Sequence, residues 1–166
     1  MCRSDRMSIW AYEQAVLSDC HFKHGAIITK GAKIIVKGRN TQRTQFLNTH
    51  AMCLHAEIDV ARKLLNCYII GKKRSRKSNN YKIPKYNLSK YIIWVVRASA
   101  TSSICNTNIK LKQSSPCAEC ITMLLSLGFK KIGFSDSNGN MIVTNIRNCP
   151  GYLSNAQKNY NKIRYT

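Results

Sequence analysis

Two short stretches, His55-Ala56-Glu57 and Pro116-Cys117-Ala118-Glu119-Cys120, carry the strongest structural signal in this chain of 166 residues. Each is followed by apolar residues at helical spacing, so each is expected to open a helix. Ser115 and the proline after it are typical of a helix start, and Gly128 is typical of a helix stop. The sequence therefore predicts two helices that each begin with metal-ligating residue types.

The chemistry of these stretches points to zinc. Cys117 and Cys120 are three residues apart, which puts both sulfur atoms on one face of the predicted helix. In the first helical turn, the positive end of the helix dipole favours their thiolate forms. Two thiolates and the neutral imidazole of His55 provide three ligands for a tetrahedral Zn²⁺ and leave the fourth position for water. Zinc lowers the pKa of such a water towards about 7, and Glu57 is placed to relay protons beside it.

Together with a strand pair that ends in Gly38-Arg39-Asn40, the two motifs resemble the zinc-dependent cytidine and deoxycytidylate deaminase superfamily. That superfamily also includes tRNA adenosine deaminases and polynucleotide cytosine deaminases. The resemblance covers about residues 8 to 146. It implies an α/β protein with the cytidine-deaminase-like three-layer fold, in which a mixed five-stranded sheet is flanked by helices.

The resemblance also implies a role for individual residues. Glu57 is the proton shuttle of a hydrolytic deamination, in which water replaces the exocyclic amine of the base and ammonia leaves. Asn40 and Ala56 are the expected substrate contacts, with Asn40 at the sugar, although Asn40 also fits a simple turn after the second strand. The expected zinc ligands are His55, Cys117 and Cys120.

Hydrophobic periodicity predicts the order of the elements. Trp94 lies in a run that is apolar on both faces, so it is expected to fill the core of a central strand. Turns at Gly31-Ala32 and Asn138-Gly139 join two pairs of strands. Solvated loops are expected over residues 71–90 and 98–114, the second with a small extra strand as an alternative. Helices are predicted over 5–18, 55–66 and 117–127, and strands over 26–29, 33–37, 91–96, 131–135 and 141–144.

The domain organisation is expected to be simple. Residues 1–149 form one zinc-dependent deaminase domain that includes the basic loop, and residues 150–166 form a C-terminal tail. His21 and His24 are interpreted as a cation at the end of the first helix and a residue at the start of the first strand, rather than as metal ligands.

Charge indicates an anionic partner. The chain has 27 Lys and Arg against 7 Asp and Glu, a net charge of +20, which favours a nucleotide or nucleic-acid substrate. Compositional drift is the alternative, although drift would enrich Glu as readily as Lys. The basic run after the second helix has three interpretations: a phosphate-binding arm, a solvated loop or a nuclear localisation signal. Its candidate phosphate-binding residues are Lys72, Lys73, Arg74, Arg76 and Lys77.

The cellular setting is expected to be intracellular. The longest apolar stretch, residues 91–96, is far too short to span a membrane, so no membrane partner is expected. The first residues lack the apolar segment of a secretory signal, which favours a reducing compartment, cytoplasmic or nuclear. A homo-oligomer is a possible partner state, because members of the family that the motifs resemble commonly self-associate.

The favoured function is conversion of a cytosine base to uracil with release of ammonia, with a nucleotide such as CMP or dCMP as substrate. One alternative is a cytosine or adenosine deaminase acting on single-stranded DNA or tRNA. The sequence departs from many free-nucleotide members because about twenty residues separate Val96 from Pro116, and loops next to a pocket shape specificity.

An alternative from another class is a non-catalytic, zinc-stabilised nucleic-acid-binding module. His50 would then join His55, Cys117 and Cys120 in a closed structural Cys₂His₂ site. That arrangement leaves Glu57 without a role.

Overall fold

The computed structural model describes residues 2–42, 45–46, 49–50, 54–73, 87–99 and 110–152. Their helices are α1 (Arg3–Val16), α2 (Ala56–Lys73) and α3 (Ala118–Ser126), with short 3₁₀ turns η1 (Leu88–Lys90) and η2 (Ile146–Asn148). Their strands are β1 (His24–Lys30), β2 (Lys33–Arg39), β3 (Gln45–Phe46), β4 (Thr49–His50), β5 (Tyr91–Ala98), β6 (Leu111–Lys112), β7 (Lys131–Ser135) and β8 (Met141–Asn145).

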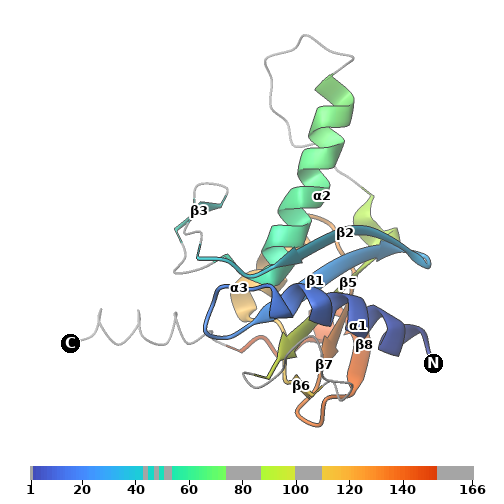
Figure 1. Cartoon of the computed structure of the whole chain (residues 1–166). Coiled ribbons are helices and arrows are strands. Elements are labelled where there is room, and N and C mark those ends of the chain that lie inside the picture. The colour runs from blue at the N-terminus through green and yellow to red at the C-terminus, as the bar shows by residue number, and fades with distance from the viewer. Residues whose placement is uncertain are drawn as a thin grey trace.

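The described residues form three layers around a mixed sheet. The strand order is β2-β1-β5-β7-β8, and β6 pairs with the end of β5. The β5–β7 pair is parallel, whereas the other pairs of this sheet are antiparallel. Helix α1 covers one face, and α2 and α3 lie on the other (Figure 1). The predicted three-layer α/β fold is confirmed, with six strands in the main sheet rather than five because β6 joins it.

β5 is the central strand that the apolar run predicts. Ile93 and Val95 pack with the residues under α2 and α3, whereas Trp94 and Val96 pack with α1. Trp94 is 2% exposed, and its indole N–H donates a hydrogen bond to the hydroxyl of Thr29 at 2.9 Å. The alternation along this strand therefore defines an α1 face and an α2/α3 face of the sheet.

The predicted end of the helix over 55–66 is wrong, and so is the start of the loop expected over 71–90. α2 continues to Lys73 instead of ending near Asn66, because residues 67–73 contain no proline to interrupt a growing helix. The expected loop over 71–90 therefore begins as helix and ends in η1, and residues 74–86 lie outside the described residues. The small strand offered as an alternative for 98–114 is present as β6, and residues 100–109 also lie outside the described residues.

Within the described parts of the chain, no helix is both long and apolar enough to cross a membrane.

Gly25 marks the point where α1 lies directly on β1. A Cβ atom here would collide with the carbonyl oxygen of Ala11 and the amide nitrogen of Ala15. Both are backbone atoms of α1, so no side-chain rotation can relieve the collision. The close approach of helix and strand therefore requires glycine at this position.

We expect Gly25→Ala to lower the free energy of unfolding by about 1–3 kcal/mol or more, since overpacking against a helix backbone forces the layers apart. Denaturant unfolding followed by circular dichroism measures the change. Gly31→Asn is the control, because Gly31 has a φ of 59° that asparagine tolerates and open space around its Cα. A loss for Gly25→Ala no larger than that for the control would contradict the close packing.

Candidate metal centre

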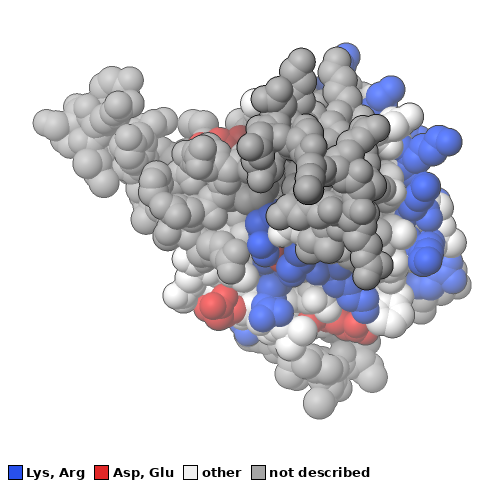
Figure 2. All heavy atoms as spheres, turned by 90° about the horizontal axis from the view of Figure 1, so that it is seen from above, with Lys and Arg blue, Asp and Glu red and all other residues white. Residues whose placement is uncertain are grey.

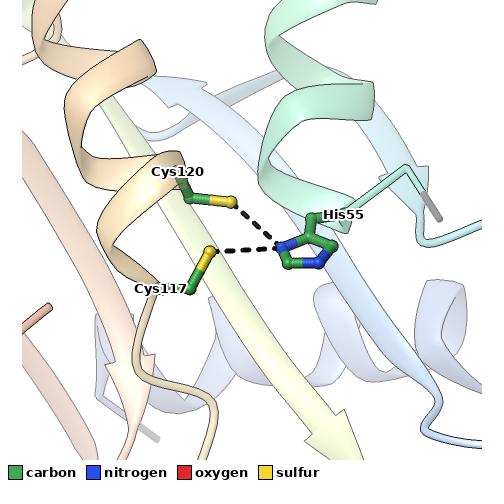
Figure 3. A group of neighbouring side chains, drawn as sticks. All are labelled: His55, Cys117 and Cys120. Carbon is green, nitrogen blue, oxygen red and sulfur yellow. Dashed lines mark hydrogen bonds between the residues drawn. The ribbon is translucent and has the colours of Figure 1, made fainter. Parts of the chain in front are cut away.

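Three side chains converge where α2 and α3 begin. Nδ1 of His55 lies 3.2 Å from Sγ of Cys120 and 3.5 Å from Sγ of Cys117 (Figure 3). The one nitrogen and two sulfur atoms all lie within 4.8 Å of one another. The structure therefore brings together the three residues that the sequence offers as zinc ligands.

Backbone hydrogen bonds fix each ligand at a helix start. The carbonyl oxygen of His55 accepts from the N–H groups of Ile58 and Asp59, at 3.1 and 2.9 Å, so His55 precedes the first turn of α2. On the other side, Cys117 is the N-cap of α3 and Cys120 lies in its first turn. Sites built on helices hold side chains more precisely than sites on loops do. The helix starts therefore position the three candidate ligands.

The chain is also tied down on either side of the cluster. Leu54 exchanges two backbone hydrogen bonds with Thr41, at 2.9 and 3.0 Å, just before the histidine. Tyr152 forms a parallel bridge with Cys117, and its carbonyl oxygen accepts from the N–H of Ala118 at 3.0 Å. The C-terminal end of the described chain therefore lies against the first turn of α3.

The donor set fits zinc. Two sulfurs and one imidazole nitrogen are the soft and borderline ligands that zinc prefers, and they are unsuited to calcium or magnesium. In the part of the chain that the structure describes, the group has three members, as catalytic zinc sites have. His50 lies in β4, and its side chain is outside the description, so the closed four-ligand site stays a prediction.

The two thiols differ in acidity. A hydrogen bond from Cys120 lowers the pKa of the Cys117 thiol to about 4, and the hydrogen bond to His55 acts in the same direction. The same Cys120–Cys117 bond, followed by burial, raises the pKa of Cys120 well above its usual value. The hydrogen bond between the two thiols therefore shifts their pKa values in opposite directions, down for Cys117 and up for Cys120.

Glu57 lies in the first turn of α2, beside this cluster. Its side chain is 5% exposed, and burial raises the pKa of its carboxyl above the ordinary 4.5. The charge of His55 lowers this pKa and the charge of Cys117 raises it, but burial has the larger effect. Ala56 is completely buried in the core under α2, so its role as a substrate contact stays a prediction.

The side chain of Asn40 makes hydrogen bonds that connect the end of β2 to the segment before β1. Its amide oxygen accepts from the backbone N–H of His24 at 2.8 Å and from the hydroxyl of Ser18 at 2.6 Å. Its amide nitrogen donates to the carbonyl of Phe22 at 2.7 Å. Asn40 is 5% exposed and thus ties the end of β2 to the start of β1. Its contact with a sugar stays a prediction.

His24 is a residue near the site whose proximity sequence reasoning missed. It opens β1 as expected, but the charges of His55 and Cys117 act on its imidazole. Burial is the largest cause that lowers the pKa of His24 to about 4, so it is neutral at pH 7. Strand alternation could have found it, because His24 is two residues before Ala26, which faces α2 and α3.

The basic run lies elsewhere. Lys72 and Lys73 end α2, about 25 Å along the helix axis from its start beside the cluster. Arg74, Arg76 and Lys77 lie outside the described residues. Their contact with phosphate stays a prediction.

Comparison with known proteins gives one informative likeness. No protein-family model matches the sequence, and no curated protein matches it. Among solved structures, cytidine deaminase from Burkholderia pseudomallei is similar, with 17% identity, a TM-score of 0.52, and coverage of 86% of this chain and 91% of that chain. The chain has the cytidine deaminase fold. This is the fold that the resemblance of the two motifs implies.

Two structures of dCMP deaminase from the cyanophage S-TIM5 are more weakly similar to this cytidine-deaminase-fold chain. The apo form has 20% identity, a TM-score of 0.45, and coverage of 80% of this chain and 82% of that chain. The complex with dCMP and dUMP has 18% identity, a TM-score of 0.39, and coverage of 80% and 77%.

We expect zinc binding at pH 7 to release at least one proton per metal ion, because Cys120 must lose its proton to become a ligand. Zinc affinity should therefore rise with pH until Cys120 ionises without metal. Isothermal titration in buffers of different ionisation enthalpy counts the protons. Cys120→Ala should lose zinc, whereas Cys149→Ala, which removes another thiol of raised pKa, should retain it. Full zinc retention in a Cys117→Ala, Cys120→Ala double variant would contradict the site.

Proposed function

We propose that this protein is a zinc-dependent hydrolytic deaminase that converts a cytosine base to uracil, with a nucleoside monophosphate as its favoured substrate. One observation carries the proposal: buried Glu57 follows His55 by two residues, in the first turn of α2, and His55 belongs to a His55–Cys117–Cys120 cluster whose ligand atoms are within 4.8 Å of one another. The fold shared with a cytidine deaminase supports the choice of base.

In this proposal, the three ligands hold zinc at the junction of α2 and α3. When bound, zinc supplies a hydroxide equivalent at neutral pH by lowering the pKa of a coordinated water. The cluster itself is set at the edge of a hydrophobic core, where low dielectric strengthens electrostatic interactions. The three ligands would thus determine where hydroxide attacks the base, and Glu57 would transfer the protons.

Glu57 suits proton transfer because burial raises its pKa. A carboxyl of raised pKa takes up a proton more readily at neutral pH than an exposed glutamate does. It can accept the proton that the attacking water loses and deliver it to the amine as ammonia leaves. The same residue then acts as base and as acid in successive steps.

A polynucleotide substrate is the second candidate, and charge is the observation that favours it. Basic side chains run along one side of the face in Figure 2 and cross its middle, whereas acidic ones form small isolated patches. The net charge of +20 exceeds what a single nucleotide needs. Parallel incubations with dCMP, CMP, cytidine, single-stranded DNA and tRNA distinguish a nucleotide substrate from a polynucleotide substrate. Ammonia release and base conversion are measured for each, and base conversion in the DNA and tRNA also shows whether adenine is deaminated.

We expect Glu57→Gln to retain zinc and the folded state but to lower turnover by roughly a hundredfold or more, because the amide cannot accept the proton. Turnover, metal content and thermal unfolding are measured on the same samples. Glu119→Gln is a matched control, since Glu119 is an exposed glutamate in the first turn of the neighbouring helix α3.

Wild-type turnover in Glu57→Gln would reject the proton-transfer role. A protein that binds zinc and nucleic acid but deaminates none of the five substrates would instead be the non-catalytic binding module.

A further inference from the structure

Exposed basic side chains gather at one end of the main sheet, where β1 ends and β2, β5 and β7 begin. Lys30 and Lys33 lie directly opposite each other beside the β1–β2 turn, and Lys30 also pairs with Tyr91, the first residue of β5. Ile92 in turn lies beside Lys131, so β7 begins at the same end. The exposed cations of this basic end are Lys30, Lys33, Lys90, Lys130, Lys131 and Arg147, together with Arg3.

Backbone contacts bring α1 and η2 to the basic end as well. The guanidinium of Arg3 donates a hydrogen bond to the carbonyl oxygen of Gly31 in the β1–β2 turn. The N–H of Ile146 donates to the carbonyl oxygen of Lys130 at 2.9 Å, which places Arg147 beside the start of β7. Figure 1 shows the β1–β2 turn and the N terminus on the opposite side of the molecule from the start of α2, and Lys and Arg line that same side in Figure 2.

These cations have no acidic partner. All 7 Asp and Glu residues of the chain belong to the part that the structure describes. In that part, Glu13 and Asp59 are the acidic residues that form ion pairs, and their partners lie in β2 and α2. Asp5, in the first turn of α1, instead accepts a hydrogen bond from the backbone N–H of Cys2 at 3.2 Å. The positive charge of the basic end is therefore not balanced by an acidic side chain.

The arrangement is costly without an anionic partner. Lys30 and Lys33 are like charges in a directly opposed cross-strand pair, which destabilises a sheet. The ammonium of Lys30 lies 5.6 Å from the centroid of the Tyr91 ring, and the guanidinium of Arg3 lies 5.9 Å from that of Trp94. These cation–π contacts position both cations but leave their charge in place. A bound polyanion would remove the repulsion.

The spacing of the cations suits a phosphate backbone. Neighbouring strands of a sheet are about 4.8 Å apart, so β2, β1, β5 and β7 spread the cations over a row about 14 Å long. Over about 14 Å of its axis, a DNA duplex carries about four phosphates on each strand. The row can therefore contact several phosphates at once.

The aromatic side chains favour a duplex over a single strand. Proteins that hold single strands add aromatic side chains on which the bases stack. In the described chain the exposed aromatic residues are Trp10, Phe22 and Tyr152. Trp10 contacts Lys37 in the middle of β2, Phe22 precedes β1 at the other end of that strand from Lys30, and Tyr152 lies against α3. The basic end therefore offers charge without a stacking platform.

We propose that the basic end of the sheet binds the backbone of double-stranded nucleic acid, independently of base sequence. Lysine and arginine contacts to phosphate position a protein on a duplex without reading its sequence. Lys30 is about 20 Å along β1 from His24, which lies near the metal cluster. The binding surface is thus separate from the metal cluster, and the inference does not rest on the proposed function.

The test measures binding of a short labelled DNA duplex to the full chain across a salt series. The logarithm of the affinity should fall linearly with the logarithm of the salt concentration. We expect a Lys30→Gln, Lys33→Gln double variant to bind about tenfold or more weakly at about 0.1 M salt and to reduce the slope by about 1.8, because each phosphate contact contributes about 0.9. A second duplex of unrelated sequence should give the same values.

A Lys110→Gln, Lys112→Gln double variant is the matched control. It removes the same charge from exposed lysines at the other end of the sheet, where β6 pairs with the end of β5. It should leave the slope unchanged. Thermal unfolding checks the fold of both variants, and the Lys30→Gln, Lys33→Gln variant should be at least as stable as the wild type because it removes two opposed like charges.

Several results would overturn the assignment. Equal losses in the two double variants would show that binding follows net charge rather than the basic end, and an unchanged slope in the Lys30→Gln, Lys33→Gln variant would also reject it. Tighter binding of a single strand of the same sequence, lost in that variant, would reassign the surface to single strands. If that variant loses binding to phosphatidylserine vesicles but keeps duplex binding, the surface contacts membranes instead.

Discussion

The site depends on two helices that begin side by side. Each helix start carries partial positive charge, so the adjacent starts of α2 and α3 repel each other unless negative charge lies between them. Cys117, whose pKa falls to about 4, supplies that charge at the N-cap of α3. A bound divalent metal would add positive charge, and ionisation of Cys120 to a second thiolate ligand would add a further negative charge. The electrostatic balance at this junction therefore links folding, thiol acidity and metal binding.

Much of this arrangement could be predicted from local sequence. The spacing of Cys117 and Cys120 on one helix face, and their place at its start, follow from helical geometry alone. The apolar run of β5 likewise predicts a strand buried on both faces, as Trp94 and Val95 show. These features are visible because each involves residues within one turn or one strand.

What sequence could not provide depends on pairing between distant segments. Arg97 in β5 lies opposite His24 in β1 and Lys112 in β6, and these three residues are far apart in the chain. No periodicity within a segment fixes the register between segments. The end of α2 was missed for another reason: residues 67–73 contain no proline, so no local breaker in that stretch ends the helix near Asn66.

The bridge between Tyr152 and Cys117 gives the molecule a mechanical asymmetry. A pulling force applied at Tyr152 would reach the first turn of α3 through the hydrogen bond between the Tyr152 carbonyl and the N–H of Ala118. The strands of the sheet would be loaded only afterwards. In single-molecule extension the metal ligands on α3 would therefore bear tension before the hydrophobic core does.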